Sequence, residues 1–218
     1  MSTTAPLRLW TFRTSPFAGK VRAALDEKGV PVELLEIHPA QRPARLRELN
    51  PLNRVPVLEV DGAAMRESSV ILEWIEETYP EPPLWPDEST ERAEARAWAR
   101  FIDDSLLVNF FLGLRKLAFG RDEEDPEDIV ERLHARVPRQ WRRLETALEA
   151  HDGPWLMGEQ FTYADLTALP LAVRLPDWAP QLMPDPQEYP LCGAWLAALR
   201  ERPSAAAIDA AGERTIEA

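Results

Sequence analysis

The chain has 218 residues, of which 45% are hydrophobic and 28% are charged, a balance typical of a soluble globular protein with one large or two modest domains. Its formal net charge of −12 disfavours binding to nucleic acid and to anionic membrane surfaces, and no apolar run reaches the roughly 20 residues that span a bilayer. The N-terminus lacks a basic segment followed by a hydrophobic block, so we expect a cytoplasmic protein without nucleic-acid or membrane partners.

Cysteine and histidine are too few and too scattered for a metal site. A single cysteine, Cys192, excludes a disulfide framework and a thiolate cluster, and its apolar neighbours predict a buried packing residue. The three histidines, His38, His134 and His151, have no ligand spacing, so we predict no metal.

A strand followed by a helix opens the chain. Residues 7–12 alternate in hydrophobicity, and residues 17–25 carry apolar side chains at helical spacing until Gly29 stops the run. Serine is a favoured N-cap and proline a favoured first helical residue, so the helix is predicted to start at Ser15-Pro16 with backbone N–H groups pointing outward. Such a helix end with a hydroxyl beside it suits a thiolate, although an ordinary helix cap is the commoner explanation of these residues alone.

A second strand over residues 32–37 completes a βαβ unit. A right-handed crossover makes the two strands parallel and puts Ser15 at the carboxyl edge of the first strand, where open α/β sheets bind ligands. A short helix is predicted over residues 44–49.

A hairpin and a helix follow. Strands over 57–60 and 63–66 flank Asp61-Gly62, a strong tight-turn signal. Pro56 is tolerated where the first of these strands begins, and a cis bond there would expose the backbone of Val55. The next helix opens at Glu67-Ser68 and ends at Tyr79-Pro80.

The composition and the hydrophobic periodicity of the sequence change after residue 80. Residues 81–90 are rich in proline and acid and read as a linker, and residues 91–218 show helical periodicity without a strand pattern. We expect Pro138 to kink its helix rather than split it. Thr162 and Asp165 have capping-box spacing, residues 189–201 form a further helix, and the terminal segment is either a final helix or frayed.

This order of elements resembles the cytosolic glutathione transferase superfamily over nearly the whole chain. Ser15-Pro16-Phe17 stands where the omega class carries Cys-Pro-Phe and the tau class Ser-Pro-Phe. The chain therefore resembles a bacterial-type member with a serine at the catalytic position, and its motif is closest to those two classes. Val55-Pro56 resembles the family's cis-proline element, Glu67-Ser68 its acid-serine pair, and Thr162 to Asp165 its helical capping box. The implied fold is α/β plus all-α: a thioredoxin-like βαβαββα domain over residues 1–80, a linker over 81–90 and a helical bundle over 91–218.

The resemblance implies glutathione as cosubstrate, no metal, and a homodimer with a role in detoxification. Ser15 would activate the thiol, and Phe17 would also bind glutathione. Val55 beside cis-Pro56 would pair with the cysteinyl backbone, and Glu67 and Ser68 would hold the γ-glutamyl group. Arg42 is the candidate for the glycyl carboxylate, with Arg54 as the reserve. A small hydrophobic electrophile would lie against apolar side chains, with Phe17, Phe110, Phe111 and Leu114 as candidates.

Two other functions stay open at this stage. Zeta-class relatives are glutathione-dependent isomerases, although they carry Ser-Ser-Cys where this chain has Ser-Pro-Phe. The superfamily also includes non-catalytic binding modules. A serine in place of the omega-class cysteine argues against disulfide exchange, because a hydroxyl cannot form a mixed disulfide.

Overall fold

The computed structural model describes residues 6–38, 41–108, 110, 126–209 and 214–216. The chain divides into two compact units: the first contains the residues up to Pro83 together with those from Pro203, and the second is Leu84–Arg202. We expected everything after residue 90 in the helical domain, whereas the structure groups the residues from Pro203 with the first unit.

The first unit is built on one mixed sheet with strand order β4-β3-β1-β2-β5. The strands are β1 (Leu7–Thr11), β2 (Val32–Ile37), β3 (Val57–Val60), β4 (Ala63–Arg66) and β5 (Arg214–Ile216). β1 and β2 are parallel, as the βαβ pattern predicted, whereas β3 runs antiparallel to β1 and pairs with β4 in the expected hairpin.

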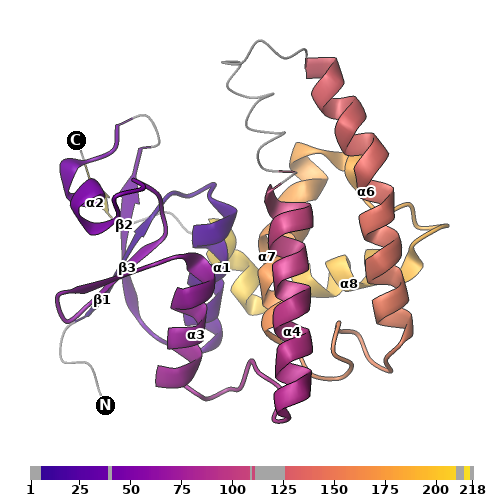
Figure 1. Ribbon diagram of the computed structural model, residues 1–218, viewed down its shortest axis with the longest axis horizontal. Helices are drawn as coiled ribbons and strands as arrows, with labels where there is room; N and C mark the ends of the chain where they lie inside the picture. The colour runs from indigo at the N-terminus through magenta and orange to yellow at the C-terminus, as the bar shows by residue number, and fades with distance from the viewer. Residues whose placement is uncertain (1–5, 39–40, 109, 111–125, 210–213, 217–218) are drawn as a thin grey trace. The chain divides into compact units, whose positions relative to one another are not determined.

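Helices cover both faces of this sheet. They are α1 (Pro16–Glu27), α2 (Ala44–Leu49), α3 (Ser68–Thr78) and the 3₁₀-helix η3 (Pro203–Asp209). In Figure 1, α1 and α3 lie together on one side of the sheet and α2 on the other. Leu46 and Leu49 of α2 join a buried cluster with Trp10, Leu35 and Val57 of the strands, so burial of one apolar face explains why so short a helix forms.

The end of the chain differs from what its sequence predicted, which was a final helix or frayed residues, with no strand after residue 90. Instead, η3 packs on α1 and β5 pairs in parallel with β2. Ile208 is fully buried in η3, which gives this segment a reason to fold. A strand of three residues is too short to display the alternation that identifies strands in a sequence.

The second unit is helical. Its elements are α4 (Ser89–Phe101), the π-helix η1 (Ile102–Leu107), α6 (Pro126–Glu149), α7 (Tyr163–Trp178), the 3₁₀-helix η2 (Pro180–Leu182) and α8 (Pro190–Glu201). α7 packs against both α4 and α8. Pro138 is exposed within one continuous α6, so the helix is not split there. Within the described part of the chain, no helix is long and apolar enough to cross a membrane.

The predicted capping box is present at the start of α7. Oδ2 of Asp165 accepts hydrogen bonds from the backbone N–H and the hydroxyl of Thr162, both at 3.0 Å. Oδ1 accepts from the Leu156 N–H and from Nε1 of Trp195, both at 2.9 Å. One carboxylate therefore joins the helix start, the preceding loop and α8.

Candidate functional site

Strand pairing gathers the predicted site residues of the first unit at one edge of its sheet. Val57, at the start of β3, is the register partner both of Trp10 near the end of β1 and of Arg66 at the end of β4. The turn after β1, the chain before β3 and the turn after β4 therefore lie at the same edge. These three segments carry Ser15 and Phe17, Val55 and Pro56, and Glu67 and Ser68, respectively.

Ser15 is the N-cap of α1, where the sequence predicted the helix start. Its N–H donates to the Phe12 carbonyl at 2.8 Å and its Oγ accepts from the Ala18 N–H at 3.3 Å. The second bond uses a lone pair of the hydroxyl, so its proton remains to be donated. Pro16 has no N–H, and the N–H of Phe17 has no acceptor among the described residues. The helix start therefore offers a hydroxyl and a backbone N–H to an anion.

The chain before β3 contains the predicted cis peptide bond between Val55 and Pro56. Val55 is half-buried against the core cluster beneath α2. Asn50, 3% exposed, fixes this segment: its Nδ2 donates to the Arg54 carbonyl at 2.9 Å and its Oδ1 accepts from the Leu52 N–H at 3.1 Å. The sequence analysis missed Asn50, although asparagine before proline is a turn signal.

Glu67 and Ser68 form the start of α3. Glu67 has φ of 67°, in the left-handed region that glutamate seldom adopts, and its carbonyl accepts from the Ile71 N–H at 2.9 Å. No side chain caps this helix. Glu67 is exposed and makes no ion pair with any described residue, whereas Ser68 is buried. The first turn of α3 thus presents N–H groups beside an unpaired carboxylate.

Lys20 links the two helix starts and was not predicted. It is fully buried in α1, its Nζ lies 3.5 Å from Oγ of Ser69 in α3, and it is 5.8 Å from the centre of the half-buried Phe17 ring. A buried ammonium next to both first turns adds positive potential to that of the helix dipoles. Lysine in an amphipathic helix is ordinarily solvated, so this burial could not be predicted from the local sequence.

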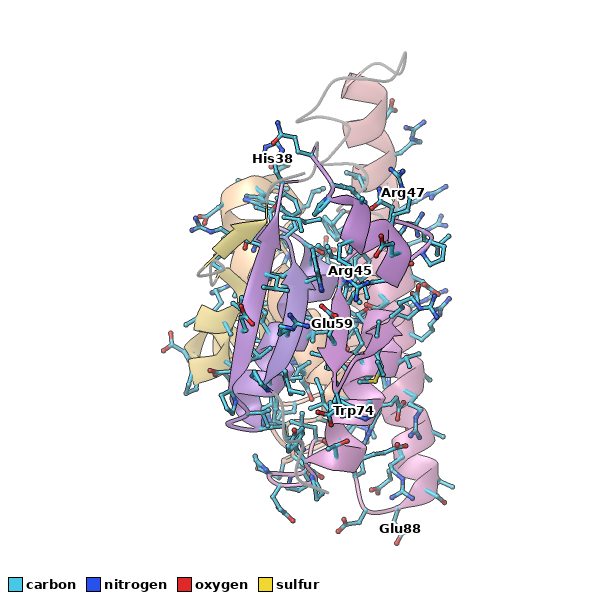
Figure 2. The ribbon with its side chains drawn as sticks, turned by 90° about the vertical axis from the view of Figure 1, so that its left-hand side faces the viewer. His38, Arg45, Arg47, Glu59, Trp74 and Glu88 are labelled. Carbon is cyan, nitrogen blue, oxygen red and sulfur yellow. The ribbon has the colours of Figure 1, made fainter. Side chains whose placement is uncertain are left out.

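The arginines of the first unit differ in their partners. The guanidinium of Arg42, the candidate for a ligand carboxylate, donates to the Asn53 carbonyl and is half-buried. Arg54 is exposed. Nη2 of Arg45 in α2 lies 3.6 Å from Oε2 of Glu59 in β3, and Figure 2 shows the two residues close together. Arg45 is thus engaged with Glu59 and Arg42 with a main-chain carbonyl.

The residues suggested for a second substrate are only partly described. Phe110 is buried in the second unit, and Phe17 is half-buried in the first. Phe111 and Leu114 lie outside the described residues. Over the residues that the structure describes, no group of three or more His, Cys, Asp or Glu side chains is arranged to hold a metal ion.

Comparisons with known proteins give the same class as the fold. Family models of the glutathione S-transferase N-terminal and C-terminal domains match residues 9–83 and 107–203. Glutathione S-transferase U1 of Arabidopsis thaliana is 43% identical over 117 residues, 53% of this chain and 52% of that protein, so the chain spans about half the length of that curated relative. A probable maleylacetoacetate isomerase of Caenorhabditis elegans is 32% identical over 78% of this chain and 79% of that protein.

A solved structure extends the likeness to nearly the whole chain. It is a glutathione S-transferase from Methylobacillus flagellatus with glutathione bound, 27% identical, with a TM-score of 0.77 over 93% of this chain and 98% of that chain. A thioredoxin-like first unit and a helical second unit define the glutathione transferase fold. The chain belongs to the glutathione S-transferase family.

Proposed function

We propose that this protein is a glutathione transferase in which Ser15 activates the glutathione thiol for attack on a small apolar electrophile. The observation that carries the proposal is the meeting of two helix starts and the cis-proline segment at one sheet edge, in a member of the glutathione S-transferase family. We further propose that the chain acts as a cytoplasmic homodimer in detoxification.

Each chemical group of glutathione has a proposed partner. The Ser15 hydroxyl and the Phe17 N–H donate to the sulfur, and the Val55 main chain pairs with the cysteinyl backbone. Glu67 pairs with the γ-glutamyl ammonium, while Ser68 and the first turn of α3 hold its carboxylate. Arg42 takes the glycyl carboxylate.

The proposed chemistry is a substitution or addition by sulfur. An ordinary thiol has a pKa of about 8.5, so donors at the sulfur raise the thiolate fraction at neutral pH by lowering that pKa. The thiol proton passes to solvent and the thiolate attacks the electrophile. With an aryl halide, an S–C bond forms and halide leaves with the bonding electron pair.

Substitution of Ser15 tests this proposal. We expect Ser15→Ala to lower kcat with chlorodinitrobenzene by about 100-fold, because removal of one oxyanion-type donor costs about that much, and to leave the Kd of glutathione within about threefold. The thiolate ultraviolet difference spectrum of bound glutathione should move to higher pH. Ser89→Ala, at the exposed start of α4, is the matched control and should resemble the wild type. Equal turnover by Ser15→Ala would remove Ser15 from the mechanism.

A glutathione-dependent isomerase is the second candidate, favoured by the likeness to the Caenorhabditis elegans protein. The two reactions differ in the fate of glutathione: conjugation consumes one molecule per turnover, whereas isomerisation returns it. Product formation from maleylacetoacetate without loss of free thiol would favour the isomerase. Glutathione binding without a thiolate signal would favour a non-catalytic module.

A further inference from the structure

A buried guanidinium joins the turn before Ser15 to the end of the chain. Arg22 of α1 is 3% exposed. Its Nη1 donates to Oγ1 of Thr11, the last residue of β1, and its Nη2 donates at 3.0 Å to the carbonyl of Arg13, which lies between β1 and α1. On its other side, Nε donates to the Ala207 carbonyl at 2.8 Å and Nη2 to the Ile208 carbonyl. One side chain therefore bridges two segments almost 200 residues apart.

The segment on the far side of Arg22 is held by several independent contacts. The Ile208 side chain is fully buried, and a Cβ added to Gly19 would stand 3.6 Å from it, so η3 packs closely on α1. Oγ of Ser204 donates to Glu27 at the end of α1. Beyond η3, the backbone of Arg214–Ile216 adds β5 to the sheet. The carbonyls that Arg22 contacts are thus parts of an anchored element.

Only arginine satisfies this geometry. Its guanidinium is a rigid fork with five donors that stays charged, whereas lysine presents a single ammonium that cannot span oxygens on opposite sides. A charge buried this deeply is tolerated only because acceptors surround it. Loss of the acceptors from η3 would leave the guanidinium to find other partners and would release the Arg13 carbonyl, two residues before Ser15.

We propose that Arg22 is a positioning residue, through which the carboxy-terminal η3 segment holds the β1–α1 turn and sets the direction of the Ser15 hydroxyl. The catalytic part of this inference rests on the proposed function, because it needs Ser15 to act on bound glutathione. The mechanical part does not. The hydrogen bond from the Ser15 N–H to the Phe12 carbonyl closes the same turn, so hydrogen exchange at this amide reports how well the turn is ordered.

The first experiment uses Arg22→Lys, which keeps the positive charge and removes the fork. We expect the Ser15 amide to exchange its hydrogen about tenfold faster, because the turn opens locally more often. We also expect the pKa of the bound glutathione thiol to rise by about 0.5, a threefold loss in the thiolate equilibrium, with KM for glutathione unchanged within about twofold. Arg8→Lys, in β1 and with a half-exposed side chain, should change neither quantity.

The second experiment acts from the other end of the bridge and guards against a poorly folded Arg22 variant. Ile208→Ala loosens η3 without touching Arg22, and Ile75→Ala makes the same change at an equally buried position in α3. Only Ile208→Ala should speed exchange at Ser15 and raise the pKa of the bound thiol. A folded Arg22→Lys with wild-type exchange and thiol pKa, or equal effects of the two isoleucine variants, would overturn the proposal.

The two readouts separate this inference from the proposed function. Exchange at Ser15 is measured without glutathione and tests the mechanical link by itself. A wild-type protein that never shows bound thiolate refutes the proposed function, whatever the exchange results. A normal thiolate in the wild type with unchanged exchange in both variants refutes the role of Arg22 alone.

Discussion

Glu67 combines an uncommon backbone conformation with a carboxylate that has no partner in the described structure. A left-handed φ in a residue other than glycine, asparagine or aspartate costs about 1–2 kcal/mol, which the surrounding fold must offset. Helix α3, which follows this residue, begins without a side-chain cap. Such strain is expected where a backbone is shaped for binding rather than for stability alone.

Glu67→Gln separates the charge of this residue from its shape. We expect the Kd of glutathione to rise about tenfold, since a hydrogen bond to a charged group contributes about 1.5–3 kcal/mol, while the free energy of unfolding changes by less than about 0.5 kcal/mol. Titration calorimetry measures the Kd. Deaminated glutathione, which lacks the γ-glutamyl ammonium, should bind the wild type and the variant equally. A tenfold loss with both ligands would contradict an ammonium contact.

Single residues with strong local chemistry could be identified from the sequence, and residues that act at long range could not. The conformational preferences of Ser15 and Pro56 predict the start of a helix and the start of a strand, respectively. The burial of Lys20 and Arg22 depends on Ser69 and on Ala207, which lie 49 and 185 residues away from them. Nothing in a local window distinguishes these two cations from ordinary surface residues.

At the scale of elements, buried carboxylates tie two helix starts in the second unit to other parts of the fold. Glu145 of α6 is 6% exposed and accepts from the N–H groups of Leu191 and Cys192 at 2.9 and 2.8 Å, which caps α8. Asp165 caps α7 and accepts from α8 through Trp195. Burial raises the pKa of Asp165, and its four donors oppose that rise. The helices are therefore tied at their ends as well as along their apolar faces.

Asp165→Asn tests how much this tie contributes. An amide offers one acceptor oxygen where the carboxylate has two, so at least one buried donor pair faces an NH₂ group. We expect the free energy of unfolding to fall by about 3 kcal/mol, measured by urea denaturation. Asp185→Asn is the matched control, because Asp185 accepts from Gln187 in an exposed turn, and it should cost less than about 1 kcal/mol. Equal losses would show that Asp165 is not the tie.

Elements with regular periodicity were predicted correctly and irregular ones were not. The βαβ unit, the hairpin and α8 follow from patterns that lie within each segment. The π-helix η1 does not, since its extra residue per turn hardly alters the spacing of Ile102 and Leu106. β5 forms because β2 offers a free edge, a property of the folded sheet rather than of residues 214–216.

At the scale of the molecule, both ends of the chain belong to the first unit. The helical unit Leu84–Arg202 is inserted between them, so the sheet receives its last strand only after the whole second unit has been traversed. Residues up to Pro83 alone would lack η3, β5 and two of the carbonyls that accept hydrogen bonds from Arg22. The first unit is therefore not an independent N-terminal segment, and its order depends on contacts of high sequence separation.

Unfolding of the molecule exposes Cys192, and the exposure makes stability depend on pH. Burial, followed by the hydrogen bond and charge of Glu145, raises the pKa of the folded thiol, which lies 3.4 Å from the Trp141 carbonyl. The unfolded thiol has a pKa of about 8.5, so above that pH the unfolded chain loses a proton that the folded chain keeps. We expect the free energy of unfolding to fall with pH above about 8.5, by up to 1.4 kcal/mol per pH unit from this group.

Cys192→Ala removes this contribution and keeps those of all other groups, so its stability relative to the wild type should improve from pH 8 to pH 10. Urea denaturation followed by tryptophan fluorescence measures both proteins, and parallel stability curves over that range would mean that Cys192 ionises equally in the folded and unfolded chains.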